Sequence, residues 1–242
     1  MLIAARSAIL AGGAAPGPTP AYWGLCFTAE AANSSVQLTA VGSPPAVTLV
    51  KSFDGINWEA YAVGEVIDLP STGDLVYLAA GEGGNESFGS STSAYHKFVI
   101  NGLVAASGDI TSLRRFDLIQ TKLANYCYNS MFNGCTGLTS APELPATKLA
   151  NYCYRLMFNG CTGLTSAPEL PATTLAPSCY SSMFSGCTRL SLIKVHFTAW
   201  GTQTNTWVGN VPSTGTFYKP SALPEEFSTS KIPTGWTVMN ID

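Results

Sequence analysis

TKLANYCYNSMFNGCTGLTSAPELPA, at residues 121–146, is followed without interruption by TKLANYCYRLMFNGCTGLTSAPELPA, at residues 147–172. The two segments differ at only two positions. A third, more divergent copy, TTLAPSCYSSMFSGCTRLSLIKVHFT, occupies residues 173–198. All three copies keep one register, because two series of cysteines recur at the same place in each copy: Cys127, Cys153 and Cys179, and Cys135, Cys161 and Cys187.

The length of each copy falls within the period of about 20–29 residues that is typical of leucine-rich-repeat solenoids. Each copy also carries leucines in an extended segment, as such repeats do. In a solenoid each unit buries its apolar face only against its neighbours. Near-identical units also argue against a catalytic centre, because catalysis needs different groups to converge on one point. The repeats therefore predict a solenoid that builds a surface.

The first half of each repeat has the spacing of an amphipathic helix. Asn125 is a suitable N-cap, and Gly134 can adopt the left-handed conformation that ends a helix. Between them the apolar residues follow an i, i+1, i+4, i+5, i+8 pattern: Cys127, Tyr128, Met131, Phe132 and Cys135. The second half, residues 138–146, alternates apolar residues but contains two prolines, which exclude an ordinary central strand. Each unit is expected to form a short helix, a tight turn and a short parallel strand.

Residues 21–107 are rich in short β-type segments separated by turn residues, which predicts a small β-sandwich. The loop at 81–93 is long and rich in Gly and Ser, so it is either a contact site or a mobile connection. The expected strands cover residues 23–29, 34–41, 46–53, 57–62, 74–80 and 95–100.

The solenoid is expected to span residues 108–198, with a degenerate first strand at 109–120 that joins it to the sandwich. A solenoid also needs a closed end, because an open end exposes core and strand edge. Residues 199–242 have a different, Trp-containing composition and are predicted to be this C-terminal cap, with strands at 215–219 and 235–239. The fold class is thus mainly β with short helices: a sandwich, a solenoid and a cap.

Residues 1–20 are expected to form an anchor and linker, in which Gly, Ala and Pro follow a short apolar segment. A signal peptide is the first alternative, although Arg6 interrupts the apolar stretch and no basic region precedes it. A disordered leader is the second. The side chains expected to be buried in an assembly are Leu2, Ile3, Ile9 and Leu10.

Composition limits the classes of function. Charged residues make up 11% of the chain, and the formal net charge is −3, so the sequence lacks the basic footprint of a nucleic-acid-binding protein. No run of about 18 apolar residues is present, and no membrane span is expected. Hydroxyl and amide groups must therefore keep the surface soluble, as is common on extracellular and virion surfaces.

The cysteines and histidines predict neither a cofactor nor a metal site. The repeat cysteines lack the CxxC pairs of zinc sites, and stacked equivalents have parallel Cβ vectors that suit a disulfide poorly. We expect buried free thiols instead. His96 and His196 fall in different predicted domains, and Glu225 and Glu226 are neighbours in a loop. The chain is therefore not expected to be an enzyme.

Polar and aromatic residues on the opposite side of the predicted helices form the candidate ligand-binding surface. Because they recur with the period of the repeats, they would build a ladder of rings and amides that suits a glycan. Alternatively, the tyrosines pack as spacers between neighbouring helices. The residues are Tyr126, Asn129, Asn133, Tyr152, Arg155 and Asn159.

MFNGCTGLTSAPELP, at residues 131–145, resembles the core of BspA-like leucine-rich repeats. Over about residues 22–242 the layout is similar to a family of surface proteins encoded by gut bacteria and their phages, with an FTAE sandwich segment and a TGTFYKP tail. The resemblance implies a non-enzymatic display or attachment role on a cell or virion surface. It supplies no binding residue for this chain.

Together these observations predict a phage virion protein, namely a head or tail fibre or decoration protein. Its N-terminus would contact virion structural proteins, and its repeats would attach to a host-surface glycan or protein. We also expect a homo-oligomer located in the virion. The alternative is a bacterial leucine-rich-repeat adhesin, secreted or held on the cell surface.

Overall fold

A computed structural model describes residues 24–115 and 121–241. The protein is mainly β, as predicted, and within the described residues its helices are two short 3-10 turns, η2 (Ile110–Leu113) and η3 (Thr202–Thr204). Strands of the N-terminal part are β1 (Leu25–Ala29), β2 (Ser34–Val41), β3 (Leu49–Ser52), β4 (Glu59–Tyr61), β5 (Val66–Leu69), β6 (Leu75–Ala80), β7 (Tyr95–Asn101) and β8 (Val104–Ser107). The others are β9 (Leu138–Ser140), β10 (Leu192–Lys194), β11 (Thr216–Lys219) and β12 (Thr237–Asn240).

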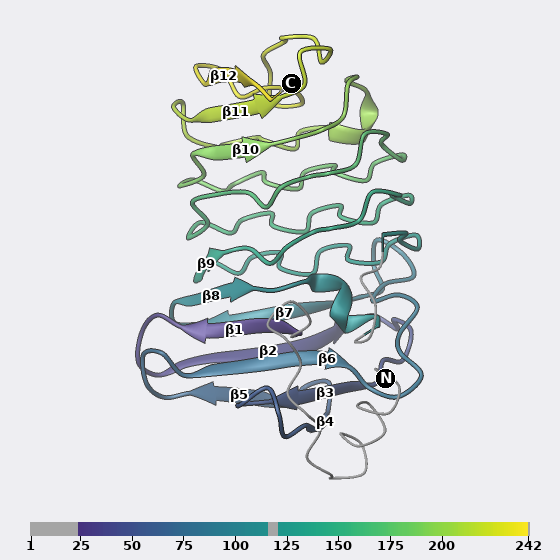
Figure 1. The fold of residues 1–242 in the computed structure, drawn as a ribbon, viewed down its shortest axis with the longest axis vertical. Helices are drawn as coiled ribbons and strands as arrows, with labels where there is room; N and C mark the ends of the chain where they lie inside the picture. The colour runs from purple at the N-terminus through teal and green to yellow at the C-terminus, as the bar shows by residue number, and fades with distance from the viewer. Residues whose placement is uncertain (1–23, 116–120, 242) are drawn as a thin grey trace.

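Strands β1 to β8 form two sheets, which we call the two-sheet region (Figure 1). One sheet has the order β4-β3-β6-β1-β8-β9, and the other has the order β5-β2-β7. Alternate residues of β2 and β7 are buried, so one face of their sheet packs on the core. Phe27 of β1 meets Phe98 of β7 edge to face at 4.9 Å. All six expected strands are present, while β5 and β8 were not predicted.

The larger sheet continues from the two-sheet region into the first repeat. Strand β8 pairs in parallel with β9, and the buried residues Val104 and Leu138 are partners in that ladder. A Cβ atom on Gly137 would lie 1.9 Å from the carbonyl oxygen of Gly102, so only glycine allows this approach of two backbones. One hydrophobic core therefore runs through both parts.

The predicted helix at residues 125–135 is wrong, because this segment is a series of tight turns. Two inward residues alternate with two outward residues, and every fourth residue has a positive φ: Tyr126 (56°), Ser130 (59°) and Gly134 (78°). The same conformation recurs in the second repeat at Tyr152 (59°) and Leu156 (54°). A true α-helix has 3.6 residues per turn and negative φ throughout. The apolar pattern has a period of four instead.

Backbone hydrogen bonds explain why this ribbon of turns is stable. Odd-numbered N–H groups close local turns, as where Met131 donates to the Tyr128 carbonyl at 3.3 Å. Even-numbered N–H groups donate to the next repeat, as where Phe132 donates to the Met157 carbonyl at 2.8 Å. Half of the donors are therefore satisfied within a repeat and half between repeats. Each repeat depends on its neighbour for that second half.

Aromatic rings stack through the repeats in two columns. Phe132, Phe158 and Phe184 follow one another at 5.4 and 5.7 Å, with nearly parallel planes. Tyr128, Tyr154 and Tyr180 form the second column at 5.8 and 6.1 Å, and Trp207 lies against both columns at their C-terminal end. Equivalent rings of successive repeats therefore stack in register, in agreement with the common register of the three sequence copies.

Residues 199–241 continue the stack after the third repeat, and Figure 1 shows them at one end of the molecule. Strands β10, β11 and β12 form a parallel sheet, which confirms the expected strands near 215–219 and 235–239. Side-chain bonds join positions 24 residues apart, as where the Trp207 indole donates to the Lys231 carbonyl at 2.8 Å. Residues 199–241 therefore cover the third repeat, and their spacing between stacked positions is slightly shorter than the length of the sequence repeats.

Two segments of the two-sheet region and its junction with the first repeat differ from expectation. Residues 110–113 form η2 rather than a strand, because the Asp109 carboxylate accepts a hydrogen bond from the Thr111 N–H and caps the turn. The Gly/Ser-rich loop at 81–93 is packed on the first repeat: Phe88 is 1% exposed and stacks on Tyr128 at 6.0 Å. This loop therefore supports the first repeat rather than reaching out as a contact loop.

Candidate functional site: the turn face of the repeats

The outward residues of 125–134, 151–160 and 177–186 form one surface, which we call the turn face. In the second and third segments, pairs of exposed or partly exposed residues alternate with pairs of buried residues, whereas in the first segment Asn129 and Ser130 are buried as well. Bonds between repeats hold the segments in register, as where Tyr126 N–H donates to the Asn151 carbonyl at 2.9 Å. Equivalent side chains of successive repeats therefore lie in columns.

Tyr126 and Tyr152 form the most regular of these columns. Their ring centroids are 4.9 Å apart, and their planes differ by 1°. Both residues are partly exposed and both are left-handed, a conformation that is uncommon for bulky side chains. Ser178 has the same left-handed φ of 53° one repeat further on, but it carries no ring. The aromatic column therefore ends at Tyr152.

Arg155 is the cation of this surface. Its backbone N–H donates to the Tyr152 carbonyl at 3.3 Å, so both residues belong to one tight turn. Its guanidinium makes no ion pair with any residue in 24–115 or 121–241. The equivalent positions in the first and third repeats are occupied by Asn129 and Ser181. The positive charge is thus specific to the second repeat.

Asn129 does not belong to the exposed surface, which corrects the prediction for this residue. Its side chain is 1% exposed, and its amide donates to the Ser91 carbonyl at 3.5 Å. The 81–93 loop covers it. Within the described residues the side-chain oxygen of Asn129 has no hydrogen-bond partner. The sequence could not indicate this burial, because the covering loop is distant along the chain.

The other two predicted amides contribute partly exposed groups. The Asn159 amide donates to the Ser182 carbonyl at 3.3 Å and so ties the second repeat to the third. At Asn133 it is the backbone carbonyl that accepts a hydrogen bond, from the Lys97 ammonium at 3.4 Å. The structure therefore brings Tyr126, Tyr152 and Arg155 together on the turn face and uses Asn159 as a link. The predicted anchor residues Leu2, Ile3, Ile9 and Leu10 lie outside the described residues.

All seven cysteines are buried free thiols, as expected. The second thiol of the second and third repeats donates to a backbone carbonyl one repeat earlier: Cys161 Sγ reaches the Phe132 oxygen at 3.0 Å, and Cys187 Sγ reaches the Phe158 oxygen at 3.1 Å. In the first repeat Cys135 Sγ donates to the Phe98 carbonyl of β7 at 3.2 Å. Burial raises the pKa of Cys187 to about 12, which keeps it protonated and unreactive. The six repeat thiols pack inside the stack as buried side chains.

A second cluster, on the strand side of the repeats, was not predicted. Glu169 Oε1 lies 2.9 Å from Lys194 Nζ and 2.5 Å from His196 Nε2. Hydrogen bonding to Lys194, and then to His196, lowers the pKa of the Glu169 carboxyl. A shallow groove of about 390 Å³ adjoins Glu169 and is lined mainly by Pro142, Pro145, Pro168 and Pro171. The carboxylate already has two partners, so the cluster resembles a surface ion-pair network.

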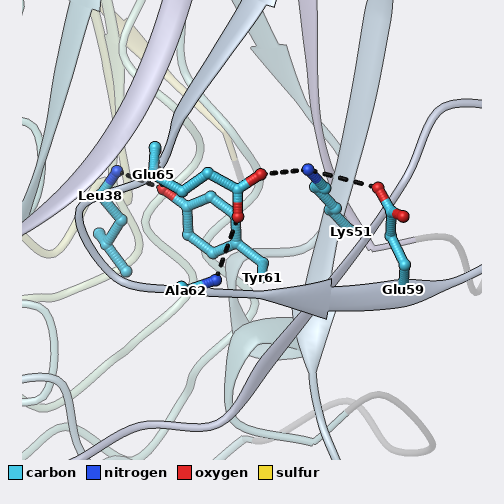
Figure 2. Close-up of polar contacts among 6 residues, drawn as sticks. All are labelled: Leu38, Lys51, Glu59, Tyr61, Ala62 and Glu65. Atoms are coloured by element: carbon cyan, nitrogen blue, oxygen red, sulfur yellow. Dashed lines mark hydrogen bonds and ion pairs between the residues drawn. The ribbon is translucent and has the colours of Figure 1, made fainter.

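A third polar group lies at the far end of the two-sheet region. Figure 2 shows Lys51 between the carboxylates of Glu59 and Glu65, with Tyr61 beside them. The Tyr61 hydroxyl accepts from Leu38 N–H at 2.8 Å and donates to the Glu65 carbonyl at 2.9 Å. Hydrogen bonding to Glu65 raises the pKa of Lys51. The Lys51 ammonium of β3 pairs with the Glu59 carboxylate of β4, so this network fastens strand β4 to the sheet.

The two histidines lie in different parts of the molecule. His96 is 3% exposed, and its Nδ1 lies 3.2 Å from the Phe88 carbonyl oxygen in the two-sheet region, whereas His196 lies on the repeats. Across residues 24–115 and 121–241, no three His, Cys, Asp or Glu side chains gather as a metal site. In the same part of the chain, no helix is long and apolar enough to cross a membrane.

Comparison of the chain with protein-family models, curated proteins and solved structures finds no match. The candidate site therefore rests on the geometry of the turn face.

Proposed function

We propose that the protein is a non-enzymatic attachment protein in which a leucine-rich-repeat solenoid, closed at its N-terminal end by a β-sandwich, presents the turn face to a host surface. The observation that carries this proposal is the column of Tyr126 and Tyr152, with ring centroids 4.9 Å apart. Stacked, partly exposed rings beside an arginine without an ion-pair partner among the described residues are typical of a binding surface.

The position of the column outside the core supports a binding role over a purely structural one. The left-handed φ of the two tyrosines is shared by Ser130, Leu156 and Ser178, so it belongs to the ribbon of turns and not to the rings. The core of the stack already contains two buried aromatic columns, through Phe132 and through Tyr128. A third column on the outside is therefore not needed to fill the interior.

We place this activity in a phage virion, as part of a head or tail fibre or decoration protein. The basis is the resemblance of the repeats and the TGTFYKP tail to phage-encoded surface proteins. Residues 1–20 would then contact virion structural proteins. A bacterial cell-surface adhesin remains the alternative, since it would use the same turn face.

Two measurements test the proposal. Fluorescently labelled full-length protein should bind intact cells of some strains in a panel of gut bacteria, and the double variant Tyr126→Ala/Tyr152→Ala should lose most of that binding while remaining folded. Phe53→Ala, at a residue 52% exposed in the two-sheet region, is the matched control and should bind normally. Wild-type protein that binds no strain would contradict the attachment role. Recovery of the protein in purified virions, rather than in the bacterial envelope, would separate the phage setting from the adhesin.

A further inference from the structure

The aromatic column on the turn face ends at the second repeat, although the third repeat has the same backbone conformation at the equivalent position. Tyr126, Tyr152 and Ser178 have φ values of 56°, 59° and 53°, so their Cα–Cβ bonds leave three equivalent backbones in the same way. The backbone register also continues, because Tyr152 N–H donates to the Pro177 carbonyl at 3.0 Å, as Tyr126 N–H does to Asn151. Ser178 therefore occupies the position of a third ring.

One face of the Tyr152 ring is consequently free of a ring partner. Tyr126 stacks on the other face, and no aromatic side chain of the described residues stacks on the face towards the third repeat. The side chain at that place is the small, partly buried Ser178. An added ring at the same spacing would continue the column and cover the exposed face of Tyr152.

The positive charge of Arg155 beside this position indicates which ligand ring would bind there. Arg155 shares a turn with Tyr152 and makes no ion pair with the described residues. The outward neighbours on the third repeat, Ser181 and Ser182, carry hydroxyl groups that lie 3.4 Å from the Asn205 carbonyl and 3.2 Å from the Thr206 hydroxyl, and each oxygen can still accept a further hydrogen bond. A ligand that satisfies all three features has a flat apolar face, hydroxyl groups and an anionic substituent. An acidic sugar in its pyranose form has this combination, whereas a neutral aromatic side chain such as tyrosine lacks the anionic substituent.

We propose that Tyr152 and Arg155 form a binding site for an acidic pyranose residue of a surface polysaccharide, with the sugar ring stacked on Tyr152 in the place of the missing third tyrosine, which the small side chain at position 178 leaves open. The inference rests on the proposed attachment function and gives it a ligand class. The carboxylate of the sugar would accept hydrogen bonds from the Arg155 guanidinium. Such charge-assisted hydrogen bonds are stronger than neutral ones.

The chain itself offers matched variants for the test. Ser178→Tyr places a third ring in the column and fills the proposed site, while Ser178→Ala removes only a hydroxyl and leaves the site open. Arg155→Asn converts the position to the residue that the first repeat has at Asn129. Tyr152→Ala removes the stacking surface. Circular dichroism and thermal unfolding of each full-length variant establish that the fold is kept.

The probes are a hexamer of galacturonic acid and a neutral hexamer of galactose, with binding measured by isothermal titration calorimetry. Wild type and Ser178→Ala should bind the acidic hexamer. We expect Ser178→Tyr and Tyr152→Ala to bind it about tenfold more weakly, which corresponds to the loss of one stacked ring. Arg155→Asn should also weaken it about tenfold and should remove the preference over the neutral hexamer.

The inference is overturned if folded wild-type protein binds neither hexamer, if it binds the two equally, or if Ser178→Tyr binds as tightly as wild type. Cell binding by the same variants separates this failure from failure of the proposed function. If wild-type protein binds cells and Ser178→Tyr binds them equally well, attachment stands and the acidic-sugar site does not. If wild-type protein binds neither cells nor the hexamer, both proposals fail.

Discussion

The two-sheet region and the stacked repeats differ in how their backbone N–H and C=O groups are hydrogen-bonded. In the two-sheet region the strands pair in antiparallel ladders. Each strand has its own partners there, as where Leu25 of β1 pairs with Leu78 of β6. In the turn segments of the repeats, alternate N–H groups close local turns, and the others donate to a carbonyl of the next repeat at a constant offset along the chain. The first arrangement defines one structure, whereas the second defines an interface that can be used again. The repeats should therefore tolerate changes in number, and the sheets should not.

Removal of residues 199–242 should have the largest effect. Trp207 covers Tyr180 and Phe184, and β11 pairs with the edge of β10, so deletion would expose both the core and a strand edge. We expect the truncated protein to aggregate during purification. Size-exclusion chromatography with light scattering measures this, and a stable, monodisperse product with native circular dichroism would contradict the covering role.

Phe158→Ala should have the next largest effect. The ring is fully buried between Phe132 and Phe184, and its removal leaves a cavity that the stacked neighbours on both sides cannot easily fill. The free energy of unfolding should fall by about 3–5 kcal/mol. Urea denaturation measures it.

Phe53→Ala provides the comparison, because Phe53 is 52% exposed. The loss there should be within about 0.5 kcal/mol. Equal losses at the two positions would mean that the Phe158 column does not hold the repeats together.

The turn segments show which features of the repeats can be predicted from the sequence and which cannot. The register of the repeats and the buried residues Cys127, Tyr128, Met131 and Phe132 follow from the sequence, because the apolar pattern records burial in any conformation. The turn conformation did not follow from it. Over so short a segment a period of four is hard to distinguish from the period of a helix, and the left-handed positions are held by residues other than glycine, such as Tyr126. Contacts between repeats stabilise that conformation, and no local signal records them.

The candidate site shows the same division. The recurrence of Tyr126 and Tyr152 predicts that they lie in one column, and they do. The burial of Asn129 depends on the 81–93 loop, and the pairing of Glu169 with Lys194 depends on the register of neighbouring strands. These contacts join residues that are distant in the chain. A single sequence does not record them.

Acidification should lower the free energy of unfolding of the two-sheet region by less than Phe158→Ala lowers that of the repeats. Desolvation by burial lowers the pKa of His96, although its hydrogen bond to the Phe88 carbonyl partly opposes this shift. The unfolded chain then takes up the proton more readily than the folded one. Stability should be fully present above about pH 6.5 and should fall as the pH drops below it, by at most about 1.4 kcal/mol per pH unit.

Urea denaturation between pH 7.5 and pH 5 measures this dependence, and His96→Gln should reduce it. His196→Gln is the control, because His196 lies on the partly exposed surface of the repeats. A dependence that disappears with His196→Gln rather than with His96→Gln would contradict the assignment.

The smallest effect is expected when the second repeat is converted into a copy of the first. The double variant Arg155→Asn/Leu156→Ser makes the two repeats identical in sequence. Both positions face outward and are partly exposed, so the free energy of unfolding should change by no more than about 0.5 kcal/mol. A loss of several kcal/mol by thermal or urea denaturation would show that the two repeats are not equivalent.

The central claim is that the repeats are interchangeable units joined by one recurring interface, and deletion of residues 147–172 tests it most directly. The first repeat would then meet the third through the contacts that Tyr128 now makes with Cys153 and Phe132 with Met157. Urea denaturation, followed by circular dichroism and by tryptophan fluorescence, should give one cooperative transition for the shortened protein. Its m-value should be lower than that of the wild type, because less surface is exposed on unfolding. A shortened protein without a cooperative transition would contradict the claim.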